Sequence, residues 1–143
     1  MKSIFLFLLF LSLIVITSCS DDSTDTEGSS STGDSSHNSG KNCLGCHSFK
    51  AAGSVYNLAV TSAYSGAIIK LTTGAGGTGT ILATLTSDNS GNFYTSNAIS
   101  FGTGIYVSVT GTDGTVKTMS SAITSGACNS CHNGSTTVKI WAE

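Results

Sequence analysis

Between residues 51 and 124 the chain alternates short apolar segments with polar stretches rich in Gly, Ser, Asn and Asp. Alternation of side-chain character is visible in residues 81–85 and 105–109, and a period of two is typical of a half-buried strand. β-Branched residues are abundant, and no long stretch repeats at the 3.6-residue period of a helix. The pattern predicts a mainly β protein, a small antiparallel sandwich. The expected strands are residues 53–61, 67–72, 80–86, 92–95, 105–110 and 116–120.

The first residues follow a different pattern. Lys2 precedes an apolar run of 13 residues, 4–16, which is interrupted only by Ser12. A membrane-spanning helix needs about 20 apolar residues, so this run is too short to form one. A positive residue followed by such a run is typical of a secretory signal. We therefore expect the chain to be exported.

Residues 16–19, Ile-Thr-Ser-Cys, resemble a bacterial lipobox, in which an aliphatic residue and two small residues precede an acylated cysteine. The resemblance implies a signal peptide over residues 1–18 and lipidation of Cys19, and several acyl chains anchor a protein durably to a membrane. Ser20 stands where Asp would favour retention at the inner membrane, so the outer membrane is expected. The acidic residues that follow resemble a surface-export tag, and a solvated acidic tether is the equal alternative. An ordinary cleaved signal with a chance cysteine is the other interpretation.

A polar tether is expected over residues 19–41. Residues 20–40 contain no apolar side chain, so they cannot bury enough surface to offset the entropy lost on ordering. Residues 42–143 then form a single expected domain. From residue 41 onward, five lysines stand against three acidic residues. This mild basic excess suits an anionic cofactor but is too small to imply nucleic acid.

Two pentapeptides carry the clearest chemical signal. Residues 43–47 and 128–132 both read Cys-x-x-Cys-His, the attachment motif of c-type haem. Two thiols three residues apart add to the two vinyl groups of one haem, and the histidine that follows ligates the iron as the proximal ligand. We therefore expect two covalently bound haem c groups. Their thioethers would form at Cys43, Cys46, Cys128 and Cys131, and their proximal ligands would be His47 and His132.

The cysteines allow three other interpretations. In an oxidising compartment, four cysteines can form two disulfides. The two pairs can also build a four-cysteine zinc site, and a single Cys-x-x-Cys can be a thioredoxin-like redox pair. None of these accounts for the histidine after each pair. With Cys19 assigned to the lipid, haem attachment uses each of the other four cysteines.

The second axial position of each iron has few candidates. Besides the proximal ligands, the mature chain contains one histidine, His37, and one methionine, Met119. His37 is either a distal ligand or an exposed tether residue, and Met119 is either a distal ligand or a buried strand residue. Two bis-histidine haems would need four histidines, whereas the chain has three. Either the haems differ, or a neighbouring chain supplies a ligand in trans and joins subunits into a homopolymer.

Three segments of the middle region resemble the carboxypeptidase-regulatory-like domain, which is of immunoglobulin type. Residues 65–71 contain Gly-Ala before a first strand, residues 86–93 contain an Asp-x-x-Gly-x-Phe turn, and residues 104–109 contain Gly-x-Tyr in a late strand. The resemblance as a whole extends over about half of the chain. The resemblance implies an immunoglobulin-like sandwich with haem-binding segments at both ends.

Two haem motifs around such a domain look like the small di-haem surface cytochromes of metal-reducing and related bacteria. This resemblance implies electron transfer at the outer membrane or cell surface, with redox partner proteins such as other multihaem cytochromes. A haem enzyme such as a peroxidase would need a proton-delivering distal group. The expected domain has no Arg or Gln, and its acids are Asp88, Asp113 and Glu143. We therefore expect an electron carrier rather than an enzyme. The remaining alternative is an immunoglobulin-like surface scaffold whose motifs bind zinc or form disulfides.

Overall fold

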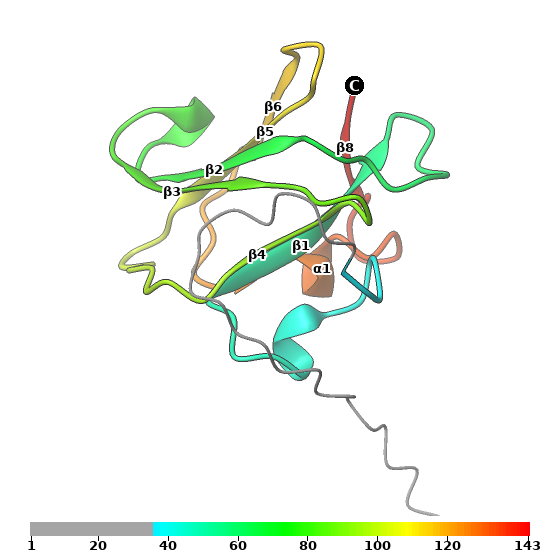
Figure 1. Ribbon diagram of the computed structural model, residues 1–143. Coiled ribbons are helices and arrows are strands. Elements are labelled where there is room, and N and C mark those ends of the chain that lie inside the picture. The colour runs from blue at the N-terminus through cyan, green and yellow to red at the C-terminus, as the bar shows by residue number, and fades with distance from the viewer. Residues whose placement is uncertain (1–35) are drawn as a thin grey trace, which may run out of the picture.

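Two β-sheets pack face to face in the computed structural model, which describes residues 36–143 (Figure 1). In the first sheet, β1 (Ala51–Asn57) is central and pairs antiparallel with β4 (Asn92–Thr95). Two short strands, β7 (Gly126–Ala127) and β8 (Ile140–Ala142), pair parallel with the start and the end of β1.

The second sheet is antiparallel throughout, in the order β3, β2, β5, β6. A single 3-10 turn, η2 (Ala75–Gly77), lies between β2 and β3. The strands of this sheet are β2 (Ile68–Thr72), β3 (Ile81–Thr86), β5 (Tyr106–Thr110) and β6 (Val116–Thr118).

The core lies between the two sheets. Val55 of β1 and Phe93 of β4 pack from one side, and Ile69 of β2 and Val109 of β5 pack from the other. Burying an apolar side chain of this size stabilises the fold by about 1.5–3 kcal/mol. The alternating pattern that predicted strands therefore reflects one face of each sheet turned towards this core.

The predicted fold class is confirmed, since the described residues are mainly β and contain almost no helix. Each of the six expected strands is present, but β1 begins two residues earlier and ends four residues earlier than the pattern suggested. The strand ends at Asn57 because its side-chain oxygen accepts hydrogen bonds from the backbone of Thr61 and Ser62, at 3.0 and 3.3 Å. Such a turn reverses the chain at once.

The sequence did not predict β7 or β8. They contain only two and three residues, and both pair parallel with β1, so the first sheet is mixed rather than purely antiparallel. Strands of this length are too short to show an alternating pattern.

Residues 36–41, which composition assigns to the tether, lie against the domain. The backbone N–H of Ser36 donates to Asp88 Oδ2 at 3.1 Å, and that of Gly40 donates to Ser54 Oγ at 2.8 Å. The acceptors, Asp88 in the turn before β4 and Ser54 of β1, are both buried. The hydrogen-bonded domain therefore begins at Ser36 or earlier. This is at least six residues before the expected boundary.

The expected signal peptide over residues 1–18, the lipidated Cys19 and the first part of the tether lie outside the described residues. Among residues 36–143, no helix has the length and apolar character needed to cross a membrane.

Candidate functional site

The two Cys-x-x-Cys-His motifs lie beside one another, next to β1. The first begins in the 3-10 turn η1 (Cys43–Gly45), and the second begins in the single-turn helix α1 (Cys128–Cys131). Figure 1 shows η1 and α1 next to each other at one side of the molecule. The side-chain nitrogen of Asn129, in α1, donates to the carbonyl oxygen of Lys41 at 2.8 Å, just before the first motif. Segments from opposite ends of the domain therefore meet at one place.

Both motifs wind through one helical turn. The backbone N–H of His47 donates to the Cys43 carbonyl at 2.9 Å, and that of His132 donates to the Cys128 carbonyl, also at 2.9 Å. Residues four apart lie on the same face of a helical turn. The first cysteine and the histidine of each motif therefore share a face. This arrangement suits a planar cofactor that is bonded to cysteine at its edge and to histidine at its centre.

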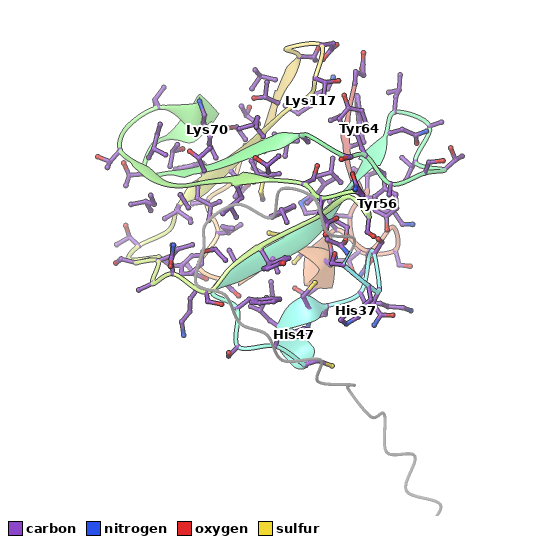
Figure 2. The ribbon with its side chains drawn as sticks, viewed as in Figure 1. His37, His47, Tyr56, Tyr64, Lys70 and Lys117 are labelled. Atoms are coloured by element: carbon purple, nitrogen blue, oxygen red, sulfur yellow. The ribbon has the colours of Figure 1, made fainter. Side chains whose placement is uncertain are left out.

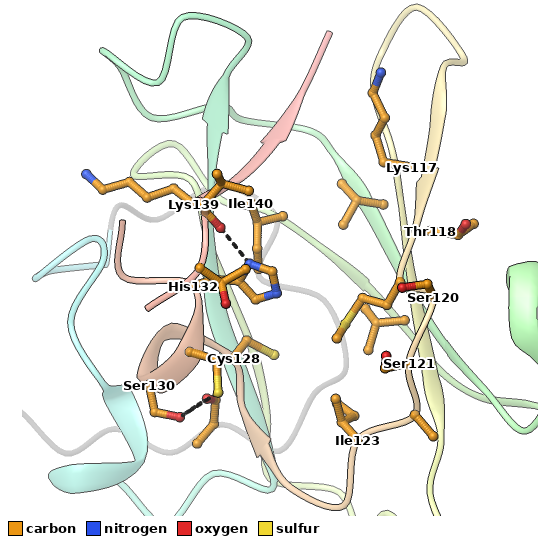
Figure 3. Close-up of a pocket in the computed structure, with 18 of the residues that line it drawn as sticks. Lys117, Thr118, Ser120, Ser121, Ile123, Cys128, Ser130, His132, Lys139 and Ile140 are labelled. Atoms are coloured by element: carbon orange, nitrogen blue, oxygen red, sulfur yellow. Dashed lines mark hydrogen bonds between the residues drawn. The ribbon is translucent and has the colours of Figure 1, made fainter. Parts of the chain in front are cut away.

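A mostly apolar cavity of about 810 Å³ opens beside the second motif (Figure 3). Cys128, Cys131 and His132 line it on one side. Figure 3 shows Ser120 and Ile123 facing His132 and Cys128 across the space. Cofactor pockets usually enclose about 300–1,000 Å³. The cavity is therefore large enough for a small organic cofactor.

Met119 lines the same cavity as His132. Its backbone N–H donates to the Val107 carbonyl at 2.9 Å, so Met119 extends the pairing of β6 with β5 by one residue. The side chain is partly buried and packs against the core. Met119 therefore continues the strand and also lines the cavity, so the structure excludes neither of the two roles that the sequence left open.

The ring of His132 is held in one orientation. Its Nδ1 lies 2.7 Å from the carbonyl oxygen of Val138 (Figure 3, dashed line). Since a carbonyl only accepts, Nδ1 carries the proton, and Nε2 of the neutral ring keeps its lone pair. Metal-binding histidines usually donate their second N–H to such a partner, which fixes the tautomer and the ring orientation. His132 is therefore prepared to bind a metal through Nε2.

The thiols of the two motifs lie in partly apolar surroundings. Burial raises the pKa of the Cys43 thiol, and burial raises the pKa of the Cys128 thiol to about 12. Smaller increases in the pKa of Cys128 come from Cys43 and Cys131, so the first thiols of the two motifs lie close enough to interact. Cys43, Cys128 and Cys131 are free thiols, whereas Cys46 is disulfide-bonded. The surroundings of Cys128 favour a neutral sulfur over a thiolate.

His37 lies beside His47, the histidine of the first motif (Figure 2). Their ring centroids are 5.6 Å apart, and the ring planes are tilted by 51°. His47 stacks on Phe49 at 4.8 Å, and Phe49 stacks on Tyr94 of β4 at 4.6 Å. The backbone carbonyl of His37 accepts a hydrogen bond of 3.1 Å from Asn92 of β4. The two histidines that the sequence singled out near the first motif are therefore neighbours.

The residues around the second motif fit covalently bound haem, and those of the first motif fit it when Cys46 is reduced. Each motif presents cysteine and histidine from one helical turn, and the second faces a cavity of suitable size. Within residues 36–143, no cluster of three or more His, Cys, Asp or Glu side chains is placed to hold a metal ion. Haem iron does not need such a cluster, because the macrocycle ligates it and the protein supplies only the axial ligands.

Sequence reasoning missed three residues that shape the site: Asn129, Val138 and Phe49. Asn129 occupies a variable position of the second motif, and Val138 acts through its backbone carbonyl, so neither carries a sequence signal. Phe49 could have been identified from the sequence, because it is an aromatic residue two positions after a predicted ligand, His47.

No family model, curated protein or solved structure matches the chain. Its function is therefore argued from the motifs and from the geometry of the residues around them.

Proposed function

We propose that this chain is a di-haem c-type cytochrome, a lipoprotein that carries electrons at the outer membrane or cell surface. The observation that supports this most strongly is at the second motif. Cys128, Cys131 and His132 line one apolar cavity, and the carbonyl of Val138 orients the histidine ring. Haem bound there supplies reversible one-electron chemistry at its iron. The chain contributes two thioether bonds, an oriented axial ligand and an apolar wall that excludes water.

For the haem of the first motif, we propose thioethers at Cys43 and Cys46 and axial ligation by His47 and His37. Two imidazoles on opposite sides of one metal, each with a bond of about 2 Å, have ring centres about 6 Å apart. The rings of His37 and His47 are separated by nearly this distance, 5.6 Å. This separation supports ligation within one chain over ligation of a neighbouring chain's haem. The proposal needs a reduced Cys46, because its sulfur cannot hold a disulfide and a thioether together.

For the haem of the second motif, we propose thioethers at Cys128 and Cys131 and axial ligation by His132 and Met119. The cavity that contains Met119 also contains the histidine. Histidine and methionine together are the axial ligands of many cytochromes c. Lys117 and Lys139 also belong to the lining, but their ammonium groups lie over the rings of Trp141 and Tyr56, 4.0 and 4.4 Å from the ring centroids.

We propose an electron carrier rather than a haem enzyme. Acid–base catalysis needs a proton-delivering group near the reacting atoms, and the described lining includes no carboxylate. The acids of the described part of the chain have other contacts. Asp88 is buried in the turn before β4, Asp113 closes the turn before β6, and Glu143 lies 3.7 Å from Lys117. The partners proposed for an electron carrier are other redox proteins, among them multihaem cytochromes.

Mass spectrometry tests the proposal. After expression with a haem-attachment system, the mature protein should gain the mass of two haems and keep a haem stain on a denaturing gel. Cys43→Ala with Cys46→Ala should leave one haem, and Cys128→Ala with Cys131→Ala should also leave one. Leu44→Ala and Ser130→Ala, at variable positions of the motifs, are the matched controls and should keep both.

A mature chain without covalent haem, or one that binds zinc or forms two disulfides through these cysteines, contradicts the proposal. Such a result would favour the scaffold interpretation instead.

Anchoring is tested separately, because Cys19 lies outside the described residues. Cys19→Ala should remove the protein from membrane fractions or leave it unprocessed, while haem loading continues. If this variant fractionates with the outer membrane as the wild type does, the protein is not a lipoprotein.

A further inference from the structure

One buried amide connects the two motifs. The side chain of Asn129 is only 3% exposed. Its Nδ2 donates to the carbonyl oxygen of Lys41 at 2.8 Å and to Ser54 Oγ at 3.0 Å. Its Oδ1 accepts from the backbone N–H of Ser54 at 3.0 Å. Both N–H groups and the oxygen of the amide therefore have partners. Two of these bonds go to Ser54 of β1, and the third goes to Lys41, just before the first motif.

These contacts join segments that are far apart in the sequence. Lys41 and Asn129 are separated by 88 positions, yet Lys41 stands two residues before the first cysteine of one motif, and Asn129 directly follows the first cysteine of the other. Ser54 Oγ also accepts from the backbone N–H of Gly40 at 2.8 Å, so a single hydroxyl contacts both segments. Gly53 permits the approach, since a Cβ there would lie 2.9 Å from the Cβ of Cys128.

We propose that Asn129 is a positioning residue that holds the two haems of this chain as one closely coupled pair. The inference rests on the proposed function, and it adds a specific arrangement to it. Each haem is covalently attached to its motif, so the separation of the motifs limits the separation of the haems. An electron that enters at one haem can then pass to the other within the same molecule.

Only an amide satisfies all of these partners. Alanine at position 129 leaves the buried Ser54 N–H without its partner and removes the amide donor from the Lys41 carbonyl. Aspartate keeps an acceptor for Ser54 but, when ionised, offers no N–H to Lys41. Asn129→Asp therefore keeps the bond from the Ser54 N–H and removes both bonds that the amide nitrogen donates, to the Lys41 carbonyl and to Ser54 Oγ.

Circular dichroism in the Soret band measures the coupling. Two nearby haems interact through their transition dipoles and give a signal with a positive and a negative lobe, and the interaction falls with the cube of their separation. The mature full-length protein should show this two-lobed signal. The sum of the two single-haem variants, Cys43→Ala with Cys46→Ala and Cys128→Ala with Cys131→Ala, should lack it.

Asn129→Ala and Asn129→Asp should retain two haems by mass and lose most of the two-lobed component. The matched control is Asn133→Ala. The side chain of Asn133 hydrogen-bonds to Ser130 at the end of α1 and to Ser135 and Thr136 of the following loop, and to nothing near the first motif, so this variant should keep the full signal. If Asn129→Ala does not load both haems, the two-lobed signal is compared with that of the wild type in Asn129→Asp and Asn129→Ser instead.

Two outcomes overturn the inference. A wild-type spectrum equal to the sum of the single-haem variants means that the haems are not a coupled pair. Asn129 variants with two haems and an unchanged signal mean that another contact sets the arrangement. A mature protein without covalent haem contradicts the proposed function itself, so the two failures are distinguishable.

Discussion

Gly53 lies where β1 passes between the core and the second motif. A Cβ at this position would lie 2.5 Å from the ring of Phe93 and 2.9 Å from the Cβ of Cys128. Phe93 is fully buried, so its ring cannot move aside without disturbing the core. We expect Gly53→Ala to lower the free energy of unfolding by about 1–3 kcal/mol, measured by urea denaturation. Haem loading of the second motif should fall as α1 is displaced.

Gly45→Ala is the matched control for this substitution. Gly45 lies within the first motif, and a Cβ there would meet only the side-chain nitrogen of Asn42, at an ordinary contact distance of 3.8 Å. A change within about 0.5 kcal/mol is expected for such a surface position. Equal stabilities of Gly53→Ala and Gly45→Ala would show that β1 and α1 do not pack against each other in this way.

The Cys128 thiol makes the stability of the haem-free chain depend on alkaline pH. Burial raises its pKa in the folded chain from the ordinary value of 9.0 to about 12. Between these two values the unfolded chain loses its proton first, so stability decreases as the pH rises. We expect a loss on the order of a few kcal/mol across this window, measured by urea denaturation of reduced, haem-free protein at several pH values.

Haem attachment should remove most of this pH dependence, because a thioether sulfur carries no proton. Cys128→Ala in the haem-free chain is the control, and its stability should vary less with pH over the same window. A haem-free wild type that is equally stable at pH 9 and pH 12 would contradict the burial of this thiol.

At the scale of the elements, the strands could be predicted from the sequence because their inward positions face one common core. The strand expected at residues 92–95 is found as Asn92–Thr95, and the one expected at 105–110 is found as Tyr106–Thr110. The prediction was least accurate for β1. This strand is buried on both faces, so it shows no alternation, and its end is determined by the side chain of Asn57.

β7 could not be predicted, because its two residues pair parallel with β1 through tertiary contacts alone. Gly126 makes this pairing possible. A Cβ there would overlap the Lys50 carbonyl oxygen and lie 2.5 Å from the Cα of Ala51. Both are backbone atoms, which cannot rotate away as a flexible side chain can.

We expect Gly126→Ala to separate β7 from β1 and to lower the free energy of unfolding by at least about 2 kcal/mol. Because α1 follows β7 directly, haem attachment at Cys128 and Cys131 should fall while attachment at the first motif continues. Mass spectrometry of the mature protein reads out both sites. Ser125→Ala, at the exposed neighbouring position, should load both haems. Full loading of Gly126→Ala at wild-type stability would contradict the observed pairing.

At the scale of the whole molecule, the residues of the candidate site could be identified from the sequence and their arrangement could not. The two motifs are local, since each needs only five consecutive residues. The hydrogen bond between Asn129 and Lys41 joins the two segments across 88 positions of the sequence. The sequence left the role of His37 open, and the structure places this exposed residue beside His47. The polar residues around it make hydrogen bonds to the turn before β4 rather than only to solvent.

The ligands proposed for the two haems make them inequivalent. The first motif has His37 beside His47, whereas the second shares a cavity with Met119. Methionine–histidine ligation raises the reduction potential relative to bis-histidine ligation. A spectroscopic redox titration of the mature protein should therefore resolve two one-electron steps, the lower from the first haem and the higher from the second. A single step that accounts for both electrons would contradict this assignment.

His37→Ala tests which haem gives the lower step, and whether the ligand comes from the same chain. The separation of 5.6 Å between His37 and His47 favours ligation within one molecule. We therefore expect the lower step to move and one haem to become high-spin by electron paramagnetic resonance, with the particle size unchanged. Ser39→Ala, a nearby variant in the same segment, should leave both steps in place.

A smaller particle for His37→Ala than for the wild type would instead show that His37 ligates the haem of a neighbouring chain and joins subunits head to tail. If both haems remain low-spin with unchanged potentials, His37 is not a ligand, and its position beside His47 has only a structural role.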